Sequence, residues 1–500
     1  MAAQRRRQYM PSIEKKESGL KKSLGLIFVY TVATGSIFTY VSYWDSVFFS
    51  YCGAGTFLAF ALMTLAILPV ALVYSELSPL FHTSGGELIY NTVGMNKHMG
   101  FLASWLIMAA WISVPPAVCM AIATFFKEIF GLAIPTIGIV GIGVVILLLV
   151  FAMSMQNITF LVKVQAFCLF ANIATTLLTA VLVLTSGHWS ISNLAGMFNF
   201  SNIETTGGIP GWIIGMALLI TPYFGFETVP QMVEEGDFPI SNTKKAICGS
   251  VLTCGVIYAI FFFCVAGLDK PAVLLADGVG DTGFMTIRAM QNLLGWRVWP
   301  MIYAVISVLL GMTASILGFW MSTVRMMYSM GKKNFLPKAF TYVNRHQQPI
   351  LPNIFLLGIS LIFILLMNAG SFMNSFFNLM SFGCACAYAI TMISAVLIHK
   401  KHPEWYAGNK NLVKGGNFTR FLAMIIMIAI AYFCTLGQGK DSWICFGIYL
   451  GIGACIWLWM VLVRWKKSRW SSIPPTAPRN SNFIAFPADG ALPRRTAPIF

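Results

Sequence analysis

The chain has 500 residues, of which 57% are hydrophobic and only 10% are charged, with a mean hydropathy of +0.75. Soluble domains carry about 25% charged residues. This composition therefore excludes an ordinary soluble protein and predicts an integral membrane protein whose surplus apolar residues face the lipid bilayer. The net charge of +16 does not indicate a nucleic-acid partner, because Lys and Arg occur in short clusters between long uncharged stretches.

Uncharged stretches predict twelve membrane-spanning helices. A spanning helix needs about 20 apolar residues. One stretch, 346–399, is long enough for two helices separated by a turn at Asn368–Ser371. All the stretches without Asp, Glu, Lys or Arg are 23–44, 46–75, 99–126, 129–162, 164–203, 205–226, 246–268, 298–324, 346–399, 421–439 and 442–463.

The distribution of cations predicts the orientation. With the N-terminus inside, 28 of the 33 Lys and Arg residues fall on the cytoplasmic side. Cytoplasmic loops retain Lys and Arg, so we predict a multi-pass protein of the cell membrane with both termini in the cytoplasm. A short interfacial helix is expected in the outer loop 267–297, and a disordered tail from 471.

Two predicted spans carry residues that interrupt a helix. The first has Thr34–Phe38 near its middle, including Gly35, and the sixth has Thr221–Glu227, including Pro222 and Gly225. Proline removes a backbone donor and glycine loosens the helix. Paired breaks in two halves of a membrane protein are typical of the central binding site of a secondary transporter. The plainer alternative is a packing glycine and a proline kink.

Ionisable residues inside spans are rare and usually functional. Glu227 is the acid closest to a predicted break, and burial favours the protonated form of a carboxyl group. We therefore predict that it binds the coupling proton; the alternative is a structural hydrogen-bonding role. Asp45 and Glu76 lie near predicted helix ends, where solvated or structural roles are expected. Neither the eleven cysteines nor the six histidines form a metal-binding pattern, so no metal and no cofactor are predicted.

Several motifs resemble the amino acid–polyamine–organocation (APC) superfamily of transporters over roughly residues 20–465. They are Tyr74–Leu77 with Gly85–Tyr90, Phe224–Glu227 with Glu234, Glu235 and Pro239, and Arg325–Gly331 with Phe335–Pro337. The resemblance implies a non-enzymatic transporter with a five-plus-five inverted-repeat fold, in which helices 1 and 6 are unwound mid-membrane. The implied organisation is an N-terminal tail (1–22), two repeats (23–203 and 204–400), two added helices (401–470) and a tail (471–500).

The resemblance also implies the substrate site. The backbone of Thr34, Gly35 and Ser36 would meet a substrate carboxylate. The remaining expected site residues, on helices 3, 6 and 8, are Trp111, Ser113, Val114, Thr221, Pro222, Phe224, Gly225, Phe319 and Trp320.

Two departures from the family pattern matter. Ser36 stands where the family has a glycine, and Asn172 is expected where some proton-coupled members place a lysine. Since Glu227 is the only plausible central acid, the site favours an amino acid or small amine over a polyamine.

Symport with a proton and amino acid exchange both stay open, as does a sodium site involving Ser315. The same fold in a polyamine transporter or a non-transporting nutrient receptor is the main alternative. A channel, a membrane-embedded enzyme and an ATP-driven pump find no matching motif.

Overall fold

The computed structural model describes residues 23–38, 43–81, 83–198, 210–277, 284–367, 372–406, 413, 415–436 and 438–465. Over these ranges the chain is helical, and pairing of extended backbone is limited to two isolated bridges. Ten helical segments are long and apolar enough to cross a membrane, and two shorter apolar helices are Leu26–Ile37 and Ile350–Leu366. The protein is thus an all-helical, multi-pass membrane protein.

The first half of the chain contains nine α-helices among the described residues. They are α1 (Leu26–Ile37), α2 (Asp45–Cys52), α3 (Thr56–Leu80), α4 (Gly86–Gly94), α5 (Lys97–Glu128), α6 (Thr136–Ser154), α7 (Ile158–Leu184), α8 (Gly211–Leu218) and α9 (Thr228–Gln231). The helices of the described second half are α10 (Thr243–Ala266), α11 (Pro271–Asp277), α12 (Met285–Asn292), α13 (Val298–Ala304), α14 (Met312–Lys332), α15 (Ile350–Met367), α16 (Phe372–Lys401), α17 (Gly416–Leu436) and α18 (Lys440–Trp459).

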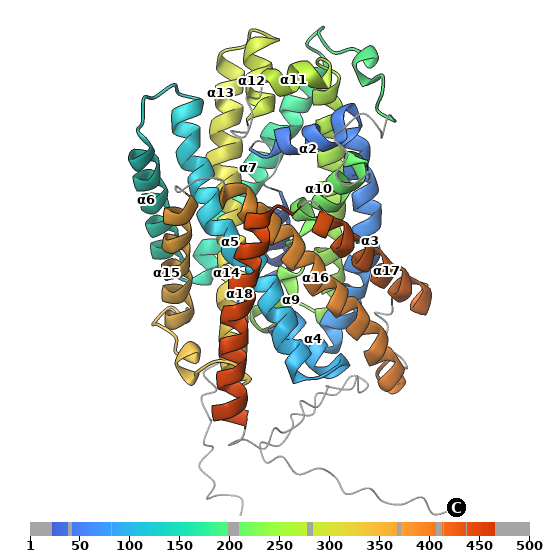
Figure 1. Cartoon of the computed structure of the whole chain (residues 1–500), viewed down its shortest axis with the longest axis vertical. Helices are drawn as coiled ribbons and strands as arrows, with labels where there is room; N and C mark the ends of the chain where they lie inside the picture. Colours follow the sequence, from blue (N-terminus) through green and yellow to red (C-terminus); the bar gives the residue numbers. More distant parts are fainter. Residues whose placement is uncertain are drawn as a thin grey trace, which may run out of the picture.

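Burial separates central helices from lipid-facing ones. The most apolar part of α5 is entirely buried, whereas only 17% of the corresponding part of α18 is. In Figure 1, α4 lies toward one end of the molecule, while α2, α11 and α12 gather at the opposite end. This arrangement agrees with the predicted alternation of inner and outer connections, because α11 and α12 belong to the predicted outer loop.

The structure divides one predicted span and places a helix in the predicted outer loop. The stretch 46–75 is divided, because α2 ends at Cys52 and the chain turns at Gly53, which has a φ of +53°, before α3 begins. A turn of small residues adds no charge, so an uncharged stretch does not reveal it. The expected interfacial helix corresponds to α12, but Met285 and Met290 are fully buried. These two side chains pack against the rest of the protein, and the position of α12 relative to the membrane interface stays a prediction. The predicted turn at 368–371 and both tails lie outside the described residues.

One crossing contains a π-helical turn. α13 continues through η8 (Val305–Gly311) into α14 as a single apolar segment. A Cβ atom at Gly311 would lie only 2.2 Å from Nδ2 of Asn172. The side chain of Asn172 thus packs directly against the backbone of this turn, which is the kind of helix irregularity that is frequent at functional sites.

Candidate functional site

The first predicted break coincides with the end of α1. Thr34, Gly35 and Ser36 form its last turn, and α1 ends at Ile37. The hydroxyl groups of Thr34 and Ser36 bond back to carbonyl oxygens of the preceding turn, at 2.8 and 2.9 Å. The groups left free at the C-terminus of a helix are carbonyls, at the negative end of its dipole. In this conformation the end of α1 therefore favours a cation.

Side chains from three other helices hold this end of α1. Ser315 of α14 donates to the carbonyl of Ser36, Tyr258 of α10 to that of Ile37, and Asn172 of α7 to that of Phe38. Asn172 thus contacts the first break as a neutral amide.

The second predicted break is an irregular stretch between α8 and α9. A 3₁₀ turn, η4 (Thr221–Tyr223), contains Pro222 and is followed by Phe224 in an extended conformation. Gly225 then has a φ of +138°, a value that side-chain-bearing residues rarely adopt. The backbone at this point is neither helical nor suited to any residue but glycine.

The two stretches touch each other at Gly225. A Cβ atom on Gly225 would lie 2.9 Å from side-chain atoms of Ser36 and Ile37 and 3.0 Å from the backbone nitrogen of Ile37. Only the absence of a side chain lets the two backbones approach this closely. The structure therefore brings the two predicted breaks together.

Gly225→Ala should consequently impair the protein. The backbone strain alone costs about 1–3 kcal/mol, and the collision separates the two stretches. We expect uptake in proteoliposomes to fall at least tenfold, with a lower temperature of thermal unfolding. Gly358→Ala on α15 is the matched control, because a Cβ atom there meets nothing within 4 Å. Equal activities of the two variants would show that the contact is unimportant.

Glu227 lies two residues beyond Gly225 and is fully buried. Its carboxylate accepts hydrogen bonds from Trp111 Nε1 of α5 at 2.9 Å and from the backbone N–H of Gly225 at 2.6 Å. A third donor is the hydroxyl group of Tyr388 of α16. The acid is thus bound by neutral donors from three segments, and the salt bridges of the described residues do not include it.

The predicted aromatic residues divide into two groups. Phe224 and Phe319 form a pair with ring centroids 5.3 Å apart, next to the second stretch. Trp320 instead donates to Asn353 of α15 at 2.7 Å, and its ring faces Phe151 of α6. The structure therefore places Trp320 away from the other predicted site residues.

The remaining predicted residues are buried near the same region. The hydroxyl group of Ser113 bonds to the carbonyls of Ala109 and Ala110 within α5, and Val114 is buried beside it. The hydroxyl of Thr221 shares a hydrogen bond with Ser381 of α16. All thirteen predicted site residues are buried in this conformation.

Sequence reasoning missed Gln165. Its amide nitrogen donates to the carbonyl of Ala314 of α14 at 2.8 Å and lies 3.4 Å from that of Val32 of α1. Gln165 thus spans α1 and α14 from α7. An uncharged residue in an apolar stretch gives no signal of this role.

Glu87, which the sequence indicates only as part of the Gly85–Tyr90 motif, is a second buried acid. Glu87 of α4 is fully buried; it accepts from the hydroxyl of Tyr74 at 2.9 Å and from Gln231 Nε2 at 3.0 Å. The ring of Tyr74 lies 5.6 Å from that of Tyr388, the partner of Glu227. In the sequence, the only sign of this buried acid is an acidic residue directly after Gly85 and Gly86.

Buried polar contacts close the end of the molecule near α4. Arg325 of α14 forms a salt bridge with Glu235, with NH2–Oε1 at 2.9 Å, and both side chains are at most 2% exposed. The backbone N–H groups of Ser23 and Leu24 donate to the Glu235 carbonyl at 3.0 Å, and Asp237 N–H donates to Leu24. We call these contacts the inner closure, because they lie at the end that the sequence predicts to be cytoplasmic.

The opposite end is closed by α12. The carboxylate of Asp45 accepts from the backbone N–H groups of Met285 and Thr286 at 3.2 and 2.8 Å. Arg288 pairs with Glu128 of α5 at 2.7 Å. Asp45 is thus buried and structural. Glu76 is also buried, in a salt bridge with Arg420 that joins α3 to α17.

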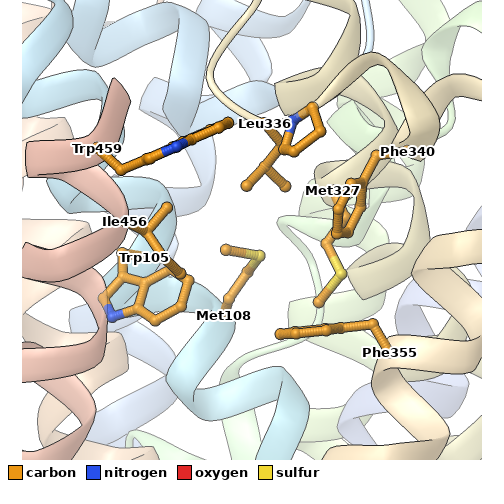
Figure 2. A pocket seen from close by; sticks show the side chains of 9 residues that line it. Trp105, Met108, Met327, Leu336, Phe340, Phe355, Ile456 and Trp459 are labelled. Atoms are coloured by element: carbon orange, nitrogen blue, oxygen red, sulfur yellow. The ribbon is translucent and has the colours of Figure 1, made fainter. Parts of the chain in front are cut away.

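A separate cavity of about 270 Å³ lies between α5, α14, α15 and α18 (Figure 2). Its lining is apolar and aromatic, with Trp105, Met108, Met327, Phe355 and Trp459 pointing toward the open space. It contains none of the predicted site residues. A cavity without polar groups does not suit the charged ends of an amino acid.

Comparison with known proteins agrees with this architecture. A family profile described as amino acid permease matches residues 22–458. The methylthioribose transporter of Bacillus subtilis (strain 168) is 23% identical over 425 residues, which cover 81% of this chain and 85% of the relative. The branched-chain amino acid permease BcaP of the same organism is 22% identical over 424 residues, covering 78% and 83%. Since the profile spans most of the chain, the protein belongs to the amino acid permease family of the APC superfamily.

Proposed function

We propose that this protein is a secondary transporter that moves an amino acid or related small amine by alternating access, with a proton carried on Glu227. The observation that supports this most is the contact between the two irregular stretches, beside a buried acid that forms no salt bridge among the described residues. The twelve-crossing, five-plus-five arrangement belongs to the same proposal. In it, α1 with α2 forms the first crossing, α8 with α9 the sixth, and α13 with α14 the eighth; both termini are cytoplasmic.

The described groups suggest how an amino acid binds. The electronegative carbonyl end of α1 would bind the substrate ammonium group once donors such as Ser315 and Tyr258 leave its carbonyls. The Phe224–Phe319 pair offers an apolar and cation-attracting surface beside it. The N–H groups of Thr34, Gly35 and Ser36 are engaged within α1. Contact with a substrate carboxylate therefore requires the last turn of α1 to open on binding.

The closed ends support alternating access. The inner closure and the α12 contacts lie at opposite ends of the described residues, and an occluded conformation belongs to the same proposal. Transport then requires each set of contacts to break in turn, which moves a bound substrate without opening a continuous channel.

We expect uptake to be independent of sodium. A sodium ion between α1 and α14 would need free carbonyl oxygens, and the amide of Gln165 already occupies the space between those of Val32 and Ala314. Replacing external Na⁺ with K⁺ should change initial uptake less than twofold. A strict requirement for Na⁺ would contradict this assignment and favour the Ser315 site.

The proposed function is tested by uptake of labelled amino acids and biogenic amines into proteoliposomes. We expect saturable, stereoselective uptake that is accelerated when the internal pH exceeds the external pH. Uptake restricted to polyamines would support the organocation alternative. Substrate-induced thermal stabilisation without any uptake would instead identify a receptor.

A further inference from the structure

The buried carboxyl groups of the described residues fall into three kinds. Glu76 and Glu235 form ion pairs with Arg, and Asp45 accepts from two backbone N–H groups at the α12 end. Glu87 and Glu227 are both fully buried, yet the salt bridges of the described chain include neither of them. Their hydrogen-bond partners are neutral. An unpaired buried carboxylate is costly, so at least one of the two groups is expected to hold a proton.

The two acids are linked through α9. Glu227 immediately precedes α9 and Gln231 ends it, four residues later. Residues at this spacing lie on one helix face, about 6 Å apart along the axis. Because Gln231 donates to Glu87 at 3.0 Å, Glu87 lies about one helical turn beyond Glu227, on the side of the inner closure.

Tyrosines lie between the two carboxyl groups. Tyr388 donates to Glu227, Tyr74 donates to Glu87, and the two rings are 5.6 Å apart. The two tyrosines are thus in ring contact with each other, and each donates to one of the two acids.

The surroundings of Glu87 accommodate either protonation state. The Oε1 atom of Gln231 is buried and has no hydrogen-bond partner. If the amide turns over, this oxygen accepts a hydrogen bond from a protonated Glu87, whereas the amide nitrogen serves the carboxylate. The position of Glu87 in the first turn of α4 also favours the carboxylate form through the helix dipole.

We propose that Glu87 is a second proton-binding acid of the transport cycle, which receives the proton from Glu227 and releases it on the inner side. This inference rests on the proposed function. In the transfer, one proton leaves the Glu227 carboxyl group and one binds the Glu87 carboxylate, so the pair keeps one proton and a charge of −1. The transfer requires the hydroxyl groups of Tyr388 and Tyr74 to come within hydrogen-bond distance, or a water molecule to bridge them; each hydroxyl then accepts one proton on its oxygen as it gives up its own. Opening of the inner closure then lets Glu87 release the proton to water.

Electrostatics supports this assignment. α4 lies in the connection between α3 and α5 rather than in a membrane span. Burial, and after it the nearby carboxylate of Glu227, raise the pKa of Glu87 to about 8. The cation bound to α4, Lys401, contacts Gly94 at its far end. Other titratable or charged groups on the surrounding described elements are Tyr74, Tyr90, Lys97, His98, Glu234, Glu235, Arg325, Cys384, Tyr388, His399 and Lys400.

Infrared titration of the purified full-length protein tests the shared proton without any substrate. The band of the protonated Glu87 carboxyl group is identified by its loss in Glu87→Gln. In Glu227→Gln the like charge is absent, so this band should titrate at least one pH unit lower than in the wild type. An unchanged midpoint would overturn the inference. Glu404→Gln, which removes an exposed acid, should leave the midpoint unchanged.

A transport measurement is the second test of the role of Glu87. Proton-driven accumulation in proteoliposomes of an amino acid that the wild type is found to take up, relative to exchange of the same amino acid, should fall at least tenfold in Glu87→Gln. Tyr74→Phe keeps both carboxyl groups and should lower the same ratio at least fivefold, which decides the question if Glu87→Gln does not fold. If both variants keep the wild-type ratio, the role of Glu87 is overturned, but the proposed function of the protein is not. Absence of proton-driven transport in the wild type would contradict the proposed function. The infrared titration would still test whether Glu87 and Glu227 share one proton.

Discussion

Glu227→Gln is expected to remove proton-driven accumulation of substrate, with a loss of at least fiftyfold, while substrate exchange falls less. Glutamine keeps the size of the side chain and one acceptor oxygen for Trp111, but it cannot take up and release a proton. The imposed pH gradient therefore no longer drives transport. The measurement is uptake after a pH jump across proteoliposomes that contain wild-type or variant protein.

Glu227→Ala separates this role from a structural one. It leaves the donors of Trp111, Gly225 and Tyr388 without their acceptor, at a cost of about 1–3 kcal/mol for each buried group. The alanine variant should thus unfold at a lower temperature, whereas the glutamine variant should lose proton coupling with less destabilisation. If Glu227→Gln transports with unchanged pH dependence, Glu227 is not the proton-binding residue.

Arg325→Met is expected to shift the protein toward an inward-open conformation. The substitution leaves the carboxylate of Glu235 buried without its cation, which typically costs 3–5 kcal/mol. Opening of the inner closure exposes Glu235 to water and relieves this cost. We expect a cysteine introduced at the buried position Val229 of α9 to react at least tenfold faster with a reagent supplied from the inner side. Uptake should fall at least tenfold.

The salt bridge between Glu76 and Arg420 provides the matched control. It is buried to a similar degree, but it joins α3 to α17 and contacts neither α1 nor α9. Arg420→Met should lower the thermal stability without accelerating cysteine labelling. Equal acceleration in both variants would show that general destabilisation, and not the inner closure, controls access.

Some features of this protein follow directly from sequence. A charge-poor composition requires a membrane environment, and Glu227 is conspicuous because it follows an uncharged stretch next to Pro222 and Gly225. Gln165 and Glu87 are different, because their roles depend on contacts with residues 149 and 144 positions away. Such contacts are created by helix packing and leave no local pattern.

The placement of Trp320 shows a second limit. Adjacent residues on a helix point about 100° apart, so Phe319 and Trp320 cannot both face the same site. The choice between them depends on the rotation of α14. The π-helical turn that precedes α14 inserts an additional residue and changes that rotation, and nothing in the uncharged sequence of Val305–Gly311 predicts it.

The contacts of Gly225 and Leu24 have a mechanical consequence. The segment preceding α1 is bonded through its backbone to the segment following α9, and Gly225 rests directly on the far end of α1. α1 and α9 are therefore held together at both ends and should move as one rigid unit. Spin labels on the two helices should keep a constant separation throughout the cycle, while the distance from either helix to α5 changes.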